Sequence, residues 1–287
     1  MGHPHSRHRS FDDLVAEGAA VPTEGWDFSW FEGRDTVQGR DTIQEPATTS
    51  VRATTRVRAT EARPSWGYAV SLAQKLAGAT AALDLQTGGG EVLDFALGRA
   101  PKAPVLTVAT EGWAPNLAKA AALLRSRGVA VVASPEPDPL PFADGAFDLV
   151  SSRHPVRAHW TEIARVLEPG GCYFAQHVGP HSVVELVEYF LGPQPEEVRN
   201  GRDPERERAD AEAAGLEVVD LRAEELRMEF HDIAAVVHFL RKVIWMVPGF
   251  TVEAYESQLR SLHQRIQDEG PFVAHSTRHL IEARKLD

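Results

Sequence analysis

Short apolar runs with β-strand character alternate with helix-length segments through the middle of the chain. This alternation constrains the fold more than any other feature of the sequence. Five such runs occur at 81–85, 105–109, 129–133, 147–151 and 172–178. Strands separated by crossover helices form a parallel sheet. The pattern therefore predicts an α/β fold with a Rossmann-like, doubly wound sheet.

Two further segments extend this sheet near the C-terminus. Leu216 to Phe230 and Phe272 to Lys285 are long and alternating, and they resemble a closing antiparallel pair. The expected sheet is mainly parallel and seven-stranded, with an antiparallel closing strand. Between these segments, Asp232 to His263 is strongly helical, and Pro248-Gly249 divides it into two helices. An insertion at that point predicts a helical lid above the carboxyl ends of the strands, where open α/β sheets bind ligands.

These patterns divide the chain into four regions. We expect an N-terminal cap over residues 1–80, a core over 81–231, the lid over 232–265 and the closing strand of the core over 266–287. Within the cap, residues 35–58 hold many Thr, Arg and Gln and few large apolar side chains. Such a composition buries little apolar area, so this segment is predicted to be a flexible insert.

The charge and hydropathy of the chain indicate which kinds of partner it binds. The formal net charge of −11 disfavours tight, purely electrostatic binding to nucleic acid and favours a small-molecule partner, although four arginines lie between Arg52 and Arg63. No run of eighteen apolar residues occurs, and the N-terminus is basic where a signal peptide needs an apolar stretch. These features predict a cytoplasmic protein without a membrane span. The oligomeric state is left open.

A glycine-rich turn directly follows the first strand of the predicted core. The sequence from Asp84 to Gly90 reads Asp-Leu-Gln-Thr-Gly-Gly-Gly, and a helix-compatible segment begins at Glu91. Glycines at a strand-to-helix turn let the backbone approach a ligand closely. The second strand ends at Glu111, whose carboxylate can accept hydrogen bonds from both hydroxyls of a ribose. Together they predict a site for a nucleoside-containing cofactor.

Two longer motifs follow in order. Residues 140–150 read LPFADGAFDLV, and residues 162–171 read EIARVLEPGG. With the glycine turn and Glu111, these stretches make the chain resemble the class I S-adenosylmethionine (SAM)-dependent methyltransferases, of the type 11-like kind, over roughly residues 81–178. The resemblance implies SAM as cofactor and methyl transfer as the activity.

The resemblance also implies roles for individual residues. Asp84, Gly88 and Gly90 would surround the amino-acid portion of SAM, Glu111 would hold its ribose, and Glu136 would lie beside the adenine amino group.

Gln86 departs from the family pattern, which usually has glycine at this position. Its side-chain amide would either contact the SAM carboxylate or crowd it.

Histidines after the later strands are candidates for acceptor chemistry. A base with a pKa near neutrality assists transfer to a hydroxyl or a protonated nitrogen. His154 follows the fourth strand, whose loop faces the SAM methyl group in the family, and Pro155 is expected to hold His154 in extended geometry. His177 and His181 are further candidates after the fifth strand, and His159 is a weaker one. A structural role competes with catalysis at each position.

No metal site is predicted. His154, His159 and His177 show no metal-ligand spacing on one helix, and the single cysteine, Cys172, excludes a multi-cysteine zinc site.

Three functions remain open. The leading one is SAM-dependent methyl transfer, by in-line displacement, to an O, N or C atom of a small-molecule acceptor, with an aromatic acceptor as one option. An aromatic acceptor could be covered by Trp26, Trp30 and Phe31 or, from the lid, by Trp245 and Phe250, although these side chains could also simply fill cores. The second is RNA guanine-N methylation, because the lid and tail resemble those of bacterial ribosomal guanine-N1 methyltransferases in layout. Those enzymes carry a cysteine zinc module that this chain lacks. The third is a SAM-binding protein that no longer transfers methyl groups.

Overall fold

The computed structural model describes residues 9–25, 28–32, 57–135 and 139–286. Most of the predicted insert at 35–58 and the predicted adenine contact Glu136 lie outside the described residues. Within the described ranges, eight strands form one sheet in the order β1-β7-β8-β6-β5-β2-β3-β4. The strands are β1 (Ala59–Glu61), β2 (Ala81–Leu85), β3 (Leu106–Glu111), β4 (Ala130–Ala133), β5 (Phe147–Arg153), β6 (Leu167–Val178), β7 (Leu216–Phe230) and β8 (Phe272–Lys285).

The sheet confirms the predicted fold class. Strands β2 to β6 pair in parallel, and β8 runs antiparallel to both β6 and β7. The short strand β1 was not predicted; it adds to the outer edge of β7 in antiparallel register. The parallel strands change winding direction between β2 and β5, and this switch point brings their carboxyl ends together at one edge.

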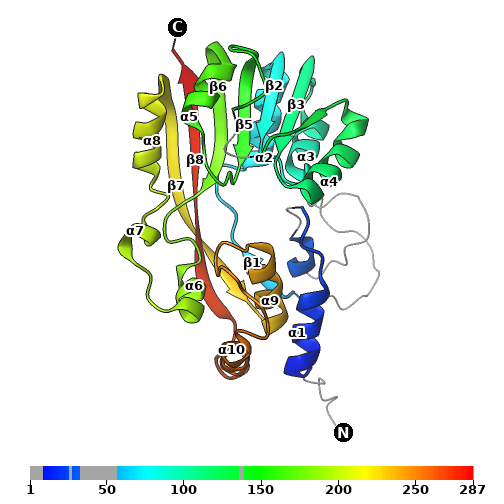
Figure 1. Ribbon diagram of the computed structural model, residues 1–287, viewed down its shortest axis with the longest axis vertical. Helices are drawn as coiled ribbons and strands as arrows, with labels where there is room; N and C mark the ends of the chain where they lie inside the picture. The colour runs from blue at the N-terminus through cyan, green and yellow to red at the C-terminus, as the bar shows by residue number, and fades with distance from the viewer. Residues whose placement is uncertain (1–8, 26–27, 33–56, 136–138, 287) are drawn as a thin grey trace.

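Helices cover both faces of the sheet (Figure 1). The helices α2 (Tyr68–Gly78), α3 (Glu91–Arg99) and α4 (Ala114–Leu124) bury side chains against one face. The helices α5 (Trp160–Val166) and α8 (Pro204–Ala213) bury side chains against the other. Alternation along β2 explains both cores, because Ala82 faces the first group of helices and Leu83 faces the second.

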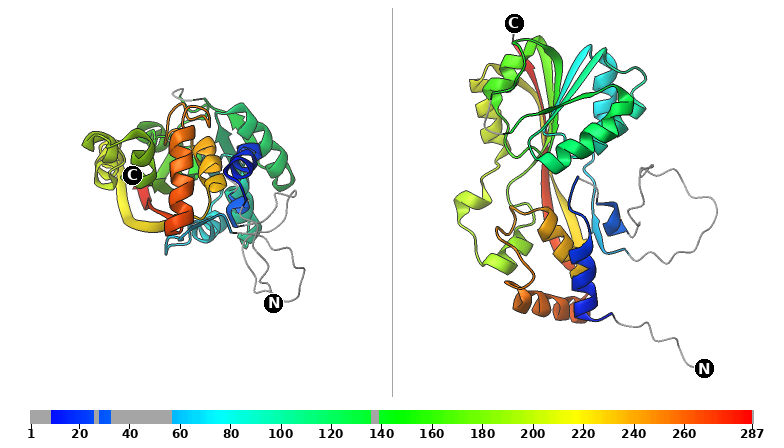
Figure 2. Two further views of the ribbon diagram at one scale, coloured as in Figure 1. Left: turned by 90° about the horizontal axis from the view of Figure 1, so that it is seen from below. Right: turned by 45° about the vertical axis from the view of Figure 1, so that its right-hand side comes forward.

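The hairpin of β7 and β8 extends well past the parallel strands. β6 pairs with β8 only from Arg278 to Arg284, whereas β7 pairs with β8 down to Phe272. This extension reaches a second hydrophobic core, which we call the distal lobe (Figure 2). Besides the hairpin end and β1, the lobe contains α1 (Phe11–Ala20), the 3-10 helix η1 (Ser29–Glu32), α6 (Val184–Leu191), α9 (Ile233–Lys242) and α10 (Glu256–Glu269).

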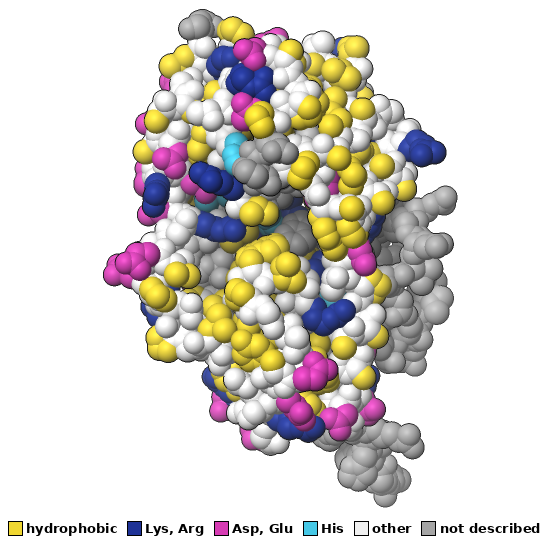
Figure 3. Space-filling model, viewed as in Figure 1, with side chains coloured by type: hydrophobic (Ala, Val, Ile, Leu, Met, Phe, Trp, Pro, Cys, Tyr) yellow, Lys and Arg dark blue, Asp and Glu magenta, His cyan; other side chains and the backbone are white. Residues whose placement is uncertain are grey.

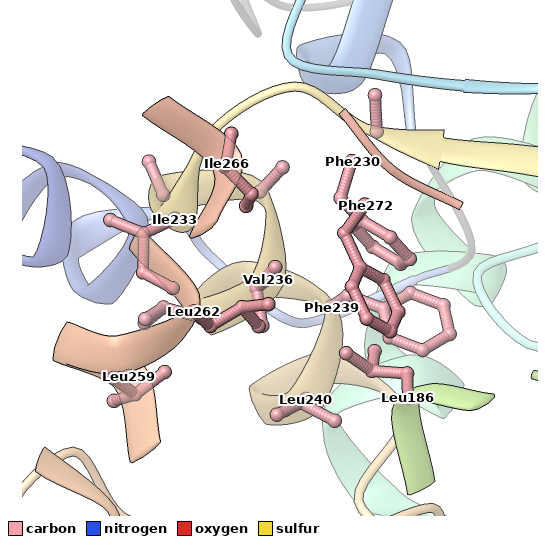
Figure 4. Packing of buried hydrophobic residues seen from close by; sticks show 14 of the residues in the cluster. Leu186, Phe230, Ile233, Val236, Phe239, Leu240, Leu259, Leu262, Ile266 and Phe272 are labelled. Atoms are coloured by element: carbon pink, nitrogen blue, oxygen red, sulfur yellow. The ribbon is translucent and has the colours of Figure 1, made fainter. Parts of the chain in front are cut away.

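Helix α9 lies at the centre of the distal lobe. Its N-cap Asp232 accepts a hydrogen bond from the amide of Ala235 at 3.0 Å. Nearly every α9 side chain is buried, as expected for a helix with apolar residues on more than one face. Helix α1 packs closely against α9, because Gly18 places its backbone directly on Ala234. Figure 4 shows the side chains of α9 and α10 meeting those of the hairpin end.

The predicted helical region 232–263 forms two helices, α9 and α10, and the expected break at Pro248-Gly249 lies between them. The short helix α7 (Glu196–Arg199) follows α6. Among the described helices, none has the length and apolar character needed to cross a bilayer. The division into cap, core, lid and closing strand stays a prediction.

Candidate functional site

The glycine-rich turn after β2 lies at the carboxyl edge of the sheet. Gln86, Gly88 and Gly90 all have positive φ angles, of 53°, 63° and 84°. Glycine adopts this left-handed region without strain, whereas a glutamine there carries a modest cost. The Thr87 amide donates to the carbonyl of Thr110 at 2.9 Å. The turn is therefore anchored to the end of β3.

Glu111 ends β3 and holds the same turn through its side chain. One carboxylate oxygen accepts from the Gly88 amide and the other from the Trp113 amide, both at 2.8 Å. The side chain is largely buried, and burial raises its pKa against the opposing effect of these amides. Each carboxylate oxygen can accept a further hydrogen bond. The arrangement fits the hydroxyls of a ribose.

Asp84, the other predicted acidic contact, lies one strand away. Its carboxylate accepts from the Ser151 hydroxyl at 2.6 Å. Burial raises the pKa of Asp84 to about 6, although the Ser151 and Thr87 hydroxyls oppose the rise. A nearby ammonium group, such as the one SAM carries, would favour the ionised carboxylate. The acidic residues of this edge thus suit the ammonium group and the ribose of SAM.

Gln86 ties the glycine-rich turn to the loop after β5. Its Oε1 accepts from the Val156 amide at 2.6 Å, and its Nε2 donates to the Arg157 carbonyl at 2.9 Å. A cavity of about 30 Å³ is left beside this bridge, lined among others by Thr110 and Ser134. Ligand pockets typically measure roughly 300–1,000 Å³. In this structure the Gln86 bridge therefore occupies part of the space at the carboxyl edge.

His154 takes part in a hydrogen-bonded chain that fixes its protonation. The Trp66 indole, which can only donate, bonds Gln176 Oε1 at 2.7 Å. The amide nitrogen of Gln176 must therefore face His154 Nε2, 2.8 Å away, and that ring nitrogen accepts. The neutral ring then carries its proton on Nδ1. Burial and the nearby guanidinium of Arg153 hold the pKa of His154 well below its usual value.

The expectation that Pro155 keeps His154 extended was wrong. His154 has a φ of 58°, in the left-handed region, and its amide donates to the Gln176 carbonyl at 2.7 Å. Histidine tolerates this region better than bulky residues do. Tertiary hydrogen bonding to β6 overrides the local preference that a following proline imposes.

The other candidate histidines have different surroundings. His177 is buried, with its Nε2 2.9 Å from the Tyr173 hydroxyl and its Nδ1 2.5 Å from a carboxylate oxygen of Glu207. Burial lowers the pKa of His177 despite this carboxylate. His181 bonds Asn200 at the surface, and His159 lines the small cavity near Gln86. His154 and His177 therefore belong to separate hydrogen-bond networks.

Sequence reasoning missed several residues of this region. Trp66 and Gln176 determine the tautomer of His154, and Glu207 bonds both His177 and His279. None of these positions lies in a recognisable motif. Trp66 precedes α2, Glu207 lies on α8 and Gln176 lies on β6, so these side chains meet their partners only in the folded chain and no local pattern could have identified them.

Segment 21–25, between α1 and η1, brings the distal lobe to the predicted cofactor edge. The Gly25 amide donates to Asn116 Oδ1 at the start of α4, at 2.7 Å. The Glu24 carbonyl accepts from Lys119 of the same helix at 3.4 Å. At the other end of the segment, the Val21 carbonyl accepts a hydrogen bond from Arg241 of α9. The segment thus spans from α9 to the helix that follows Glu111.

Comparisons with known proteins agree with this geometry. Residues 83–175 match the model of a methyltransferase-domain family. No curated protein matches the chain in sequence. The structure of the BH2331 protein of Bacillus halodurans, a candidate methyltransferase, is similar at 21% identity and a TM-score of 0.53, covering 76% of this chain and 99% of that one. The YcgJ protein of Bacillus subtilis is similar at 18% identity and a TM-score of 0.51, covering 76% and 98%.

The matched residues run from β2 into β6 and include the glycine-rich turn, Glu111 and both longer motifs. The two solved structures share the fold of the chain. The order of strands, the acidic residues at their carboxyl ends and the family match agree on SAM as the cofactor. Residues 83–175 of the chain therefore match a SAM-dependent methyltransferase domain, set in the Rossmann-like fold that such domains have.

Proposed function

We propose that the chain transfers the methyl group of SAM to an O, N or C atom of a small-molecule acceptor. SAM supplies an electrophilic methyl group on a sulfonium, and displacement in line with the sulfur needs an aligned nucleophile in a dry site. In this proposal Glu111 holds the ribose, Asp84 receives the ammonium group, and the glycines at positions 88 and 90 let the backbone approach the cofactor.

The observation that carries the proposal is the contact of segment 21–25 with α4. The Gly25–Asn116 hydrogen bond places part of the chain beside the helix start that follows Glu111. Such a cover suits a small acceptor better than a folded RNA. Figure 3 shows a hollow across the waist of the molecule, with basic and hydrophobic side chains along its borders.

Two further observations favour a small molecule over RNA. The net charge of −11 opposes a phosphate backbone, and acidic side chains are interspersed with basic ones on the face drawn in Figure 3. Trp30 and Phe31, considered above as aromatic contacts, are buried against His238 in the distal lobe. They fill a core and so do not offer a stacking platform for an unpaired base, whereas Trp245 of the same candidate set is 42% exposed.

His154 has the features of a hydrogen-bond donor to the acceptor. Its Nε2 lone pair accepts from Gln176, so the neutral ring carries its proton on Nδ1 and can act only as a donor through that N–H. A base would need a lone pair directed at the acceptor. We therefore propose that His154 positions the acceptor, and we assign no catalytic base to His177.

Label transfer from methyl-labelled SAM tests the function. The protein is incubated with a metabolite extract and, separately, with total RNA from the same cells. The label is expected in the low-molecular-weight fraction, while label found only in RNA would contradict the proposal. His154→Gln should keep turnover within a few-fold, because the amide still donates. A fall of about 10²–10⁴-fold in this variant would show instead that His154 is a general base.

A further inference from the structure

Three potential metal ligands converge where β6, α8 and β8 meet. His177, Glu207 and His279 each offer one ligand atom, and these atoms all lie within 4.8 Å of one another. His177 and His279 are direct partners across the β6–β8 pairing. Glu207 reaches both imidazoles from the first turn of α8 with a single carboxylate oxygen, at 2.5 Å and 3.0 Å. The three side chains therefore enclose one small volume.

We propose that His177, Glu207 and His279 bind one divalent transition-metal ion. Two imidazoles and one carboxylate form a ligand set that suits zinc and iron, with coordination positions left open. Bonds of about 2.0–2.1 Å place neighbouring ligand atoms of a tetrahedral ion roughly 3.3 Å apart. The separations of 2.5 Å and 3.0 Å already approach that value. Small side-chain movements complete the geometry.

The charge balance of the cluster favours a cation. Both histidines are almost fully buried, and no Lys or Arg forms an ion pair with Glu207 in the described part of the chain. Arg202 interacts with this carboxylate only at longer range. The Glu207 side chain is 21% exposed, and the two imidazoles themselves are its close partners. A metal ion held between the three groups would pair the carboxylate directly.

A further hydrogen bond supports the cluster, and a cavity lies beside it. The Tyr173 hydroxyl bonds Nε2 of His177 at 2.9 Å, which holds that ring with its Nδ1 toward Glu207. Partners of this kind orient the imidazole ligands of metal sites. A cavity of about 220 Å³ adjoins His279, between Pro204 at the start of α8 and Thr277 of β8. Of the three ligands, only His279 borders this cavity.

The test uses zinc as the probe on the full chain. His3, His5 and His8 lie close together in the sequence, and imidazoles bind zinc. The parent protein and all variants therefore carry glutamine at these three positions. After treatment with a chelator, the protein is equilibrated with Zn²⁺ and desalted, and bound zinc is measured by mass spectrometry and competition titration. We expect one ion per chain. Glu207→Gln should weaken binding by at least roughly tenfold, as changes even outside the ligand set do in metal sites.

His275→Gln is the matched control. His275 lies on the same strand and bonds Glu185 at 2.7 Å, but that pair is not part of the cluster. This variant should bind zinc as tightly as its parent. A second variant, His279→Asn, removes one imidazole ligand and should also weaken zinc binding. If this variant fails to fold, the absorption spectrum of the parent chain with Co²⁺ in place of zinc reports the type of ligands instead. The proposal is overturned if the parent retains no stoichiometric zinc, or if Glu207→Gln binds zinc with unchanged affinity.

Discussion

Glu111→Ala is expected to weaken SAM binding by roughly ten- to a hundredfold. The carboxylate offers charge-assisted hydrogen bonds to the ribose, worth about 1.5–3 kcal/mol, and 1.4 kcal/mol corresponds to a factor of ten. It also holds the glycine-rich turn through the Gly88 amide, so its loss releases one wall of the site. Isothermal titration calorimetry with SAM measures the change.

Asp94→Ala is the control for this substitution. Asp94 lies on α3 directly after the same turn, but its carboxylate pairs with Arg127 at the surface. Exposed pairs of this kind contribute little to stability, so SAM affinity should stay unchanged. Equal affinities for wild type and Glu111→Ala would show that Glu111 does not contact the ribose.

Phe230→Ala is expected to destabilise the whole protein by about 3–5 kcal/mol, the range for removing a buried aromatic ring. Phe230 is fully buried at the end of β7, pairs with Phe272 across the hairpin, and meets the ring of Phe239 edge-on at 5.3 Å. Figure 4 shows the three rings together. A decrease in melting temperature of roughly 6–20 °C should follow for a chain of this size.

Val219→Ala serves as the control, because Val219 lies on the same strand with its side chain 46% exposed. Its effect should stay within about 0.5 kcal/mol. Because β7 runs through both the distal lobe and the main sheet, the two parts should unfold in one cooperative transition. Phe230→Ala should lower the temperature of that transition. Separate melting of the lobe, with the main transition unmoved, would mean that the two cores fold independently.

The parallel part of the fold could be predicted because its signals are local. Each strand from β2 to β6 contains a short apolar run, and Gly128 ends the helical segment before β4 as expected. β6 begins five residues before its predicted run, at Leu167. The same is true of the glycine-rich turn and of Glu111, which follow their strands directly. Their proximity then follows from parallel pairing alone.

The remainder depends on tertiary contacts that no local pattern encodes. β1 has three residues, too few for a periodic signal, and it exists because β7 offers an unpaired edge. The left-handed backbone of His154 depends on the Gln176 carbonyl, more than twenty residues away in sequence. The meeting of Glu207 with His279 likewise requires α8 to be packed against the sheet beside β7.

Binding of SAM to the intact chain tests the central claim most directly. A ligand that binds only the native state adds about 2.7 kcal/mol of stability at a hundredfold excess over its Kd. SAM, or its demethylated product, should therefore raise the melting temperature clearly, and NAD at the same concentration should raise it much less. Equal shifts with SAM and NAD, or no shift with SAM, would contradict the assignment.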